Sequence, residues 1–227
     1  MIRTRAFIFA RGGSKGIKRK NLVPFNGIPL IAHSILLAQE FSCIEKIYVS
    51  TDSEEIADVS RMYGASIIKR PIELASDSSP EWLSWQHAIK YSVELNGSFD
   101  KFISLPTTSP LRIKSDIEDC LQSLNDVDVV ITATKSKRNP WFNMVQIDEF
   151  GQSKLINKNN AFHRRQDAPP CFDITTVAYV STPEFILESS GIWEGRVATV
   201  VIPPERAIDI DTQMDLEFAR FLSERKI

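Results

Sequence analysis

Short apolar runs alternate along the chain with stretches in which apolar residues recur every three or four positions. Residues 5–10 predict a buried strand, and residues 29–41 place Ile31, Ile35 and Ala38 on one face of a helix. The same alternation of strand and amphipathic helix continues to about residue 133. Strands and helices that follow one another in this way favour an α/β fold built on a parallel sheet.

Further elements follow from the same two periods. The predicted strands are 44–49, 65–69, 99–105, 127–133, 174–180 and 197–202, and the predicted helices are 54–63, 80–95, 116–124 and 212–226. Ser53 and Thr212 are expected to cap their helices, and Gly97 is expected to end one. Because residues 127–133 are almost all apolar, we expect that strand at the centre of a parallel sheet. The fold class predicted is a doubly wound, mostly parallel, Rossmann-like sheet.

Residues 135–172 interrupt the alternation. They contain Trp141, several Asn and Lys residues and the pair Pro169-Pro170, without a clean period. We expect them to form an arm inserted into one domain that spans residues 1–227, because a chain of this length is one ordinary domain.

The charge is distributed unevenly along the chain. Residues 1–39 hold seven cationic side chains and no acid, whereas the remaining 188 residues hold 20 cations and 29 acids. A basic segment on an acidic protein indicates a local anion site. Nucleic-acid binding would need a wider basic surface, and the isoelectric point near 6.0 argues against it.

Composition narrows the class and the compartment. Hydrophobic residues make up 43% of the chain, which is ordinary for a globular protein, and no apolar run is long enough to cross a bilayer. The three cysteines are odd in number and widely spaced, and the first residues do not have the pattern of a secretory leader. We therefore expect a cytoplasmic protein with reduced thiols and no membrane partner.

The first candidate site is the basic, glycine-rich segment 10–21, A-R-G-G-S-K-G followed by K-N. Glycines after a first strand let backbone N–H groups approach a phosphate chain, and cations add charge to hold it. The segment fits neither the Walker A motif nor G-x-G-x-x-G. A basic turn that only faces water is the alternative, but the position directly after strand one favours a phosphate site.

The second candidate is the segment 208–212, I-D-I-D-T. Alternation in an extended chain puts Asp209 and Asp211 on one side and both isoleucines on the other. Two carboxylates on one face favour a cation between them, and Mg²⁺ together with substrate phosphates suits such a pair. The alternative is that Asp211 or Thr212 only caps the last helix.

Three further segments are weaker signals when taken alone. Hydroxyls and a cation follow a strand in residues 105–112, where Thr107, Thr108 and Ser109 could line a substrate pocket. Adjacent arginines in H-R-R-Q, residues 163–166, suit an anionic group, and residues 70–77 combine Arg70 with a later Ser and Asp. A plain turn or a solvated face remains the alternative for each of these segments.

Taken together, these segments resemble the CMP-sialic acid synthetase, or acylneuraminate cytidylyltransferase, family. The motifs occur in the family's order: A-R-G-G-S-K-G…K-N at 10–21, V-S-T-D at 49–52, R-P-x-E-L-A-S-D at 70–77, T-S-P-L-R at 108–112 and I-D-I-D-T at 208–212. The resemblance runs nearly from end to end. It implies a nucleotidyltransferase fold, a homodimer with the arm of 135–172 against the partner subunit, and Mg²⁺-dependent transfer of CMP from CTP to a 2-keto-3-deoxy sugar acid.

The resemblance also implies roles for particular residues. The nucleotide would be held by seven residues, which are Arg11, Gly12, Ser14, Lys15, Lys20, Asn21 and Arg70. Asp209 and Asp211 look like the metal-binding pair, and Arg11, Lys20 and Asp211 like the catalytic groups. The attacking hydroxyl must also lose a proton, and Asp211, or a hydroxide on the metal that it holds, is one candidate proton acceptor. The sugar acid would meet Thr107, Thr108, Ser109, Arg165, Asp173 and Tyr179.

Two departures from the family pattern concern the sugar side. Pro106-Thr107 stands where many members have a Gln-Pro pair, and Asp173 with the following I-T-T stands where they have an Arg and an Asn-Gly pair. The acid could be sialic acid, a legionaminate-like or pseudaminate-like relative, or another keto-deoxy acid. Two other functions stay open: a nucleotidyltransferase acting on a sugar 1-phosphate, and a non-catalytic nucleotide-binding protein. The cytidylyltransferase hypothesis requires the glycine-rich segment and the aspartate pair to meet in space.

Overall fold

The computed structural model describes residues 2–157, 162 and 164–225, and a mixed sheet of seven strands forms its body. The strand order is β11-β7-β10-β6-β1-β4-β5. The strands of this sheet are β1 (Thr4–Phe9), β4 (Ile44–Thr51), β5 (Ser66–Lys69), β6 (Lys101–Ser104), β7 (Val129–Lys135), β10 (Phe172–Ser181) and β11 (Val197–Val201). β10 runs antiparallel to both of its neighbours, and every other neighbouring pair is parallel.

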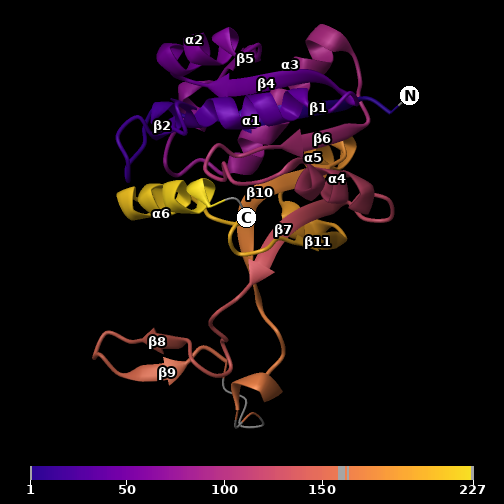
Figure 1. Cartoon of the computed structure of the whole chain (residues 1–227). Helices are drawn as coiled ribbons and strands as arrows, with labels where there is room; N and C mark the ends of the chain where they lie inside the picture. The colour runs from indigo at the N-terminus through magenta and orange to yellow at the C-terminus, as the bar shows by residue number, and fades with distance from the viewer. Residues whose placement is uncertain (1, 158–161, 163, 226–227) are drawn as a thin grey trace.

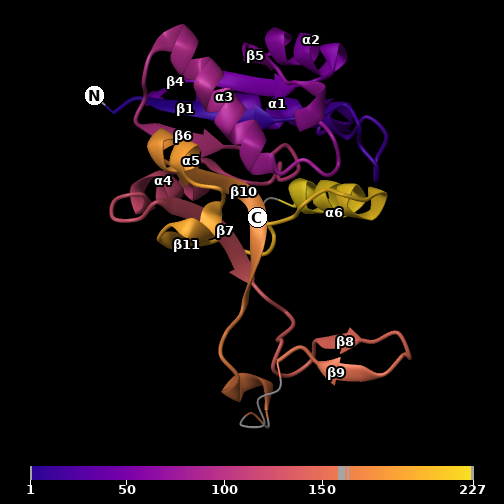
Figure 2. The same cartoon turned by 180° about the vertical axis from the view of Figure 1, so that it is seen from behind.

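Helices cover both faces of the sheet, as the doubly wound prediction requires. They are α1 (Leu30–Gln39), α2 (Glu54–Met62), α3 (Glu81–Asn96), α4 (Lys114–Ser123), α5 (Pro183–Glu188) and α6 (Gln213–Glu224). Helix α1 lies in front of the sheet in Figure 1, and α3 lies in front of it in the reverse view of Figure 2.

Alternation along β1 explains why the two faces differ. Ala6 and Ile8 pack on one face with residues of α1, α2 and α4, whereas Phe7 packs on the other face with α3. The second face is aromatic: the Phe7 ring lies 4.9 Å from the Phe102 ring and 5.4 Å from the Tyr48 ring, centroid to centroid. Such pairs stabilise a core by about 0.5–1.5 kcal/mol each beyond the burial of their area.

Helix ends follow the local signals in the sequence. The Ser53 side chain accepts a hydrogen bond from the Ile56 N–H, and the Thr212 side chain accepts one from the Asp215 N–H. Gly97 follows α3 with a φ of 71°, a left-handed conformation that costs glycine little. These three predictions are confirmed.

One expectation about the sheet is wrong. The apolar strand predicted at 127–133 is β7, which is buried but lies next to the edge strand β11, and its other neighbour β10 is antiparallel. Its apolar run reflects burial by helices on the sheet rather than a central position among parallel strands. The direction of β10 is set by the chain's excursion between β7 and β10, which apolar periodicity does not reveal.

The segment between β7 and β10 leaves the body of the molecule. It contains the hairpin β8 (Val145–Ile147) and β9 (Ser153–Leu155) and the 3-10 helix η3 (Arg165–Asp167). Both views show these elements projecting away from the sheet, joined to it by two connecting segments of the chain (Figures 1 and 2). No helix in the described ranges is both long enough and apolar enough to pass through a bilayer.

Candidate active site

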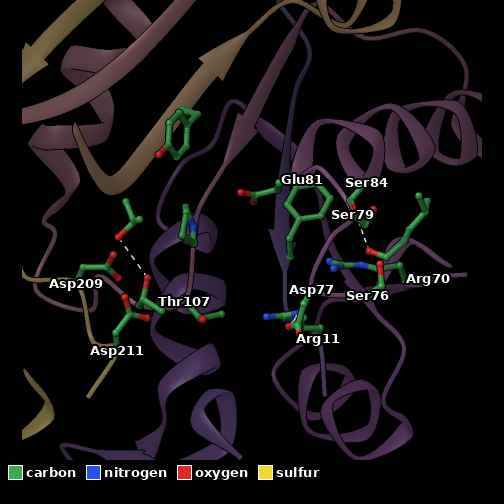
Figure 3. Close-up of a pocket in the computed structure, with 16 residues that line it drawn as sticks. Arg11, Arg70, Ser76, Asp77, Ser79, Glu81, Ser84, Thr107, Asp209 and Asp211 are labelled. Carbon is green, nitrogen blue, oxygen red and sulfur yellow. Dashed lines mark hydrogen bonds and ion pairs between the residues drawn. The ribbon is translucent and has the colours of Figure 1, made fainter. Parts of the chain in front are cut away.

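The largest concentration of the predicted residues surrounds a cavity of about 350 Å³ at the carboxyl ends of β1 and β6. Ligands of open α/β sheets bind at this edge, where the direction of strand order reverses. Its lining comes from five stretches of the chain and consists of Phe9, Arg11, Arg70, Leu74, Ser76, Asp77, Ser79, Glu81, Ser84, Pro106, Thr107, Thr108, Thr176, Tyr179, Asp209 and Asp211. Figure 3 shows Asp209 and Asp211 on one side of it and Arg11 and Arg70 on the other.

The glycine-rich loop after β1 is fixed by side chains from neighbouring strands. The Gly12 N–H donates to Asp52 Oδ1 at 2.9 Å, just after β4. The buried Asn21 side chain donates to the Arg11 carbonyl at 3.0 Å and accepts from the Thr107 hydroxyl at 2.6 Å. Asn21 therefore ties this loop to the turn after β6. Gly12, Ser14 and Asn21 line a small side cavity that Arg11 shares with the main one.

The two ends of the chain meet at Asp211. Lys20 Nζ lies 2.7 Å from Asp211 Oδ1, and the Lys20 side chain is only 18% exposed. The backbones also touch, because a Cβ added to Gly16 would lie 2.1 Å from the Asp211 carbonyl oxygen. Position 16 therefore requires glycine, because the two backbones lie too close together for a side chain. The expected meeting of the basic loop and the aspartate pair is present.

Two cations of the loop converge on a single carboxylate. Arg11 Nη1 lies 2.5 Å from Asp77 Oδ1, and Lys15 Nζ lies 2.6 Å from Asp77 Oδ2. Hydrogen bonds from Lys15 and then Arg11 hold the pKa of Asp77 below its usual value. All three side chains are at least a third exposed, so this arrangement contributes little to stability. It does show that both cations can reach one anionic group at the edge of the cavity.

Alternation places the aspartate pair as predicted. Asp209 and Asp211 both line the cavity, while Ile210 is fully buried and packs with Ile208 under α6. Burial raises the pKa of Asp209; the nearby Thr108 hydroxyl opposes the shift, and the charge of Asp211 adds to it.

One carboxylate oxygen of the pair lacks a protein partner. Asp209 Oδ1 is buried and has no hydrogen-bond partner within the described part of the chain. A buried, unpartnered carboxylate oxygen next to a second carboxylate suits a hard cation such as Mg²⁺. In the ranges that the structure describes, no group of three or more His, Cys, Asp and Glu side chains could hold a metal ion. A cation at this pair would take its remaining ligands from substrate and water.

Arg70 reaches the cavity from the end of β5. Its guanidinium is almost buried, donates from Nε and Nη2 to Ser50, and lies 5.6 Å from the Phe9 ring centroid. Burial lowers the pKa of Arg70, and the charges of Glu81 and Asp52 oppose that shift. The Nη1 atom has no partner among the described residues, so it is available to a ligand.

A bulge in β10 brings two side chains to the same cavity. Thr176 and Tyr179 are three residues apart and would face opposite sides of a regular strand, but the register with β7 shifts between Thr175 and Tyr179. The bulged backbone is satisfied by the Thr132 hydroxyl, which accepts from the Ala178 N–H at 3.2 Å. Burial raises the pKa of Tyr179 to about 12, so its hydroxyl keeps its proton near neutral pH.

A buried arginine connects this bulge to the turn after β6. Arg112 donates to the carbonyls of Ser109, Val177 and Pro106 and is fully enclosed. Burial lowers its pKa to about 9, which still leaves it charged at neutral pH. Arg112 therefore fixes the relative positions of the two segments that supply Thr107, Thr108, Thr176 and Tyr179.

Some predicted substrate residues lie elsewhere. Ser109 is buried behind the cavity wall and pairs with the Thr176 hydroxyl at 2.7 Å. Asp173 is exposed at the start of β10, opposite Thr134, and does not line the cavity. The backbone of Arg165 belongs to η3 in the projecting arm, while its side chain and His163 lie outside what the structure describes. Within one chain, η3 lies in the arm, away from the sheet whose strand ends border the cavity (Figure 1).

Sequence reasoning missed several lining residues. Leu74, Ser79, Glu81 and Ser84 follow Arg70 within 14 positions, in η2 (Ile72–Leu74), the next loop and the first turn of α3. Their position in the predicted order of elements could have identified them. They connect the end of a strand to the next helix at the ligand-binding edge of the sheet. Phe9 was missed because it lies inside a strand, and Thr176 was named only as part of the I-T-T stretch after Asp173.

Comparison with known proteins gives concordant results. The cytidylyltransferase family model matches residues 6–227. The chain is 36% identical over 224 residues to the CMP-N,N'-diacetyllegionaminic acid synthase of Campylobacter jejuni, which covers 96% of this chain and 94% of that relative. It is 33% identical over 224 residues to post-translational flagellin modification protein B of Campylobacter coli, with the same coverage.

A solved structure shares the fold at lower sequence similarity. The structure of CMP:2-keto-3-deoxy-manno-octonic acid synthetase complexed with CTP superposes with a TM-score of 0.72 at 16% identity, covering 99% of this chain and 100% of that one. This likeness concerns the fold alone, and it spans nearly the whole length of both chains.

Proposed function

Because the chain belongs to the cytidylyltransferase family, we propose that it transfers CMP from CTP to the anomeric hydroxyl of a 2-keto-3-deoxy sugar acid, with release of pyrophosphate. The acid proposed is sialic acid or a related nonulosonic acid, and the legionaminic acid synthase among the relatives supports that class. The observation that supports the proposal most directly is the meeting of the basic loop and the aspartate pair, through Lys20 and Asp211, at one cavity.

The loop after β1 binds the triphosphate of CTP. Arg11 and Lys15 already converge on one carboxylate, Asp77, and can hold phosphate oxygens in the same way. Lys20, held by Asp211, adds a third cation where charge develops on the phosphates as pyrophosphate leaves. Asn21 contributes to nucleotide binding indirectly. Its side-chain amide nitrogen and oxygen are both used in hydrogen bonds that hold the loop in place.

Asp209 and Asp211 hold Mg²⁺ in this proposal. The unpartnered, buried Oδ1 of Asp209 supports the assignment, because a bound cation would satisfy it. When bound, Mg²⁺ supplies Lewis-acid stabilisation of charge on the phosphate oxygens. Asp211 is also placed to accept the proton of the attacking hydroxyl, because it faces the cavity and stays open to solvent.

The sugar acid occupies the half of the cavity beside β6 and β10. Thr107, Thr108, Thr176 and Tyr179 present hydroxyl groups there, which suits a polyhydroxylated ligand. In this half the structure describes no free arginine for the acid's carboxylate, so the bound metal or a partner subunit must supply that charge.

We infer that the chain works as a homodimer through the arm of residues 135–172. This segment projects from the body and exposes apolar side chains, which are Phe142, Met144, Val145, Ile147, Phe150, Ile156 and Phe172. So many exposed apolar side chains on one projection favour burial against protein. A second copy of the chain is the proposed partner, because its arm offers the same apolar surface for a two-fold contact.

The three free thiols support a reducing, cytoplasmic setting.

Pyrophosphate release tests the activity directly. Each of CTP, UTP, ATP and GTP is incubated with Mg²⁺ and one member of a panel of nonulosonic and octulosonic acids. The proposal expects release with CTP only when both Mg²⁺ and a suitable acid are present. Release with sugar 1-phosphates instead would favour the other nucleotidyltransferase class, and nucleotide binding without any product would favour a non-catalytic role.

A further inference from the structure

The cavity has two chemically different halves. The half over β1, β5 and α3 contains the Phe9 ring, Leu74, Arg70 and Glu81 together with Ser76, Asp77, Ser79 and Ser84, whereas the other half contains two threonines after β6, Thr176, Tyr179 and the aspartate pair. A flat aromatic face and an apolar side chain beside a guanidinium donor and a carboxylate acceptor suit a planar nucleobase. The hydroxyl-rich half suits a sugar. Given the proposed function, the base of the nucleotide lies in the first half.

Glu81 is the carboxylate in that half that forms no ion pair among the described residues, since Asp77 is paired with Arg11 and Lys15. It is the first residue of α3, and its carboxylate points to the middle of the cavity between the sides of Arg70 and Asp209 (Figure 3). The donor to it in the described part of the chain is Trp85 Nε1, at 3.3 Å from Oε1. One carboxylate oxygen therefore remains for a ligand.

The surroundings of Glu81 make this carboxylate selective. Arg70 and Glu81 feel each other's charge, but no direct ion pair joins them in the described ranges. Glu81 is exposed to solvent, but partial desolvation beside the cavity still raises the pKa of its carboxyl group, while the hydrogen bond from Trp85 and the charge of Arg70 oppose that shift. An acceptor in such a place favours a ligand group that donates a hydrogen bond.

Cytosine and uracil differ at the position where this matters. Cytosine carries an exocyclic N4 amine, a donor, next to the acceptors N3 and O2, whereas uracil carries the acceptor O4 next to a donating N3–H. Arg70 as donor and Glu81 as acceptor match the edge of cytosine. With uracil, O4 would face the carboxylate without a proton between the two oxygens.

We propose that Glu81 accepts a hydrogen bond from the N4 amine of the base and is the residue by which this chain selects CTP over UTP. This inference rests on the proposed function, because it assumes that a cytidine nucleotide occupies the cavity. With UTP bound, the Glu81 carboxylate would face the O4 carbonyl oxygen instead of an amine. We expect this mismatch to weaken the binding of UTP relative to CTP by a factor of about 10² or more.

Direct nucleotide binding tests the proposal without any sugar acid. The dissociation constants of CTP and UTP with Mg²⁺ are measured by titration calorimetry for the wild type, for Glu81→Gln, and for the control Glu94→Gln at the exposed far end of α3. The wild type and the control should bind CTP about 10² times more tightly than UTP. Glu81→Gln should bring this ratio to within about tenfold, mainly through tighter UTP binding, because an amide can either accept from N4 or donate to O4.

Other outcomes overturn the assignment. An unchanged CTP-to-UTP ratio in Glu81→Gln contradicts it, and an unchanged ratio with a raised KM for the sugar acid would place Glu81 against the sugar instead. If no acid in the panel is turned over, the proposed function fails, but the calorimetric ratio still decides the role of Glu81.

A second measurement needs no variant and applies even if Glu81→Gln does not fold. The wild-type ratio should fall as the pH is lowered through the titration of Glu81, because a protonated carboxyl group can donate to O4. The charged groups that face Glu81 are Arg70 from β5 and Tyr179 and Asp209 across the cavity. Arg70 and Tyr179 keep their protons over this range, and Asp209 acts on the phosphate end, which CTP and UTP share. A ratio that is constant with pH contradicts the proposal.

Discussion

At the scale of single residues, Asp211 combines several contacts in one place. Its carboxylate pairs with Lys20, its carbonyl oxygen abuts Gly16, and its backbone N–H donates to Asp215 at the start of α6. The side chain itself remains 68% exposed toward the cavity. A residue whose backbone is fixed by packing and whose side chain stays open is well suited to position a cation or a proton acceptor.

Asp211→Asn should therefore lower turnover by about 10²–10³ while leaving the fold intact. The exposed carboxylate contributes little to stability, so its removal acts on the reaction rather than on the core. Turnover with saturating CTP and the melting temperature are the two measurements. Asp119→Asn, on the exposed side of α4, is the matched control and should change neither. Full turnover in Asp211→Asn would remove this residue from the mechanism.

Glu81 should make stability depend on pH in a definite direction. Its carboxyl group has a raised pKa in the folded chain, because desolvation disfavours the charged form. The folded state thus binds more protons than the unfolded state between the ordinary glutamate pKa of 4.5 and the raised value. In that window stability must fall as pH rises.

The variant Glu81→Gln lacks this titration. Its free energy of unfolding relative to the wild type should improve from pH 4.5 upward and level off above the raised pKa, as measured by urea unfolding at several pH values. Glu94→Gln should show a difference that does not change with pH. A flat difference for Glu81→Gln as well would mean that its carboxyl group is not perturbed.

Residue-level prediction from the sequence worked where local chemistry decides the outcome. Asp209 and Asp211 alternate with isoleucines, so their shared face could be predicted from the period of an extended chain, and Arg11 and Lys20 stood out in a region without acids. Glu81 could not be found in this way. Its direction depends on where α3 starts relative to β1 and β10, which is a tertiary fact.

At the scale of elements, the loop between β1 and η1 (Lys20–Leu22) joins the two halves of the site. It is held by Asp52 after β4, by Thr107 after β6 and by the backbone before α6. Each of these segments follows or precedes a regular element, so the rigid sheet determines where the loop lies.

Gly16→Ala should disturb this loop, and Gly13→Ala should not lower stability. A Cβ at Gly16 would lie 2.1 Å from the Asp211 carbonyl oxygen, whereas a Cβ at Gly13 meets nothing within 4 Å. Such overpacking typically costs about 1–3 kcal/mol and must move the aspartate segment away from the loop. We expect a lower melting temperature and weaker binding of Mg²⁺ with CTP for Gly16→Ala. Equal melting temperatures in the two variants would mean that the loop and this segment are not in contact.

The elements themselves could mostly be predicted, while their pairing could not. Periodicity identified β1, β4, β5, β6 and α1 to within a few residues, because burial on one or both faces leaves a regular pattern. The antiparallel direction of β10 and its bulge leave no such pattern. The bulge depends on Thr132 and Arg112, which satisfy its backbone from other elements.

At the scale of the whole molecule, the arm is the feature that a single chain does not explain. Its hairpin β8–β9 exposes Ile147 by 65% and Phe150 by 80%. Neither side chain belongs to the buried core. Their substitution should therefore affect association rather than folding.

The double variant Ile147→Ser with Phe150→Ser should convert a dimer to a monomer at concentrations where the wild type is dimeric. The expected cause is the loss of apolar contact area in the interface between two copies. Light scattering coupled to size-exclusion chromatography measures the mass. Met62→Ser, on the equally exposed surface of α2, is the control and should remain dimeric. A wild-type chain that is monomeric at all concentrations would refute the dimer.

The fold class of the whole molecule followed from the sequence because helices and strands alternate through its first 133 residues. The location of the cavity also followed, since the loop after β1 and the turn after β6 must share one edge of a sheet. The course of residues 135–172 did not follow, because a segment without a regular period carries no signal of the direction in which it runs.

The location of a bound metal and triphosphate tests the central claim most directly. A crystal structure with Mn²⁺ and a non-hydrolysable CTP analogue would locate the metal by its anomalous signal. We expect Mn²⁺ in coordination contact with Asp209 and Asp211, and the phosphates against the loop that carries Arg11 and Lys20. Metal and phosphates bound away from either segment would contradict it.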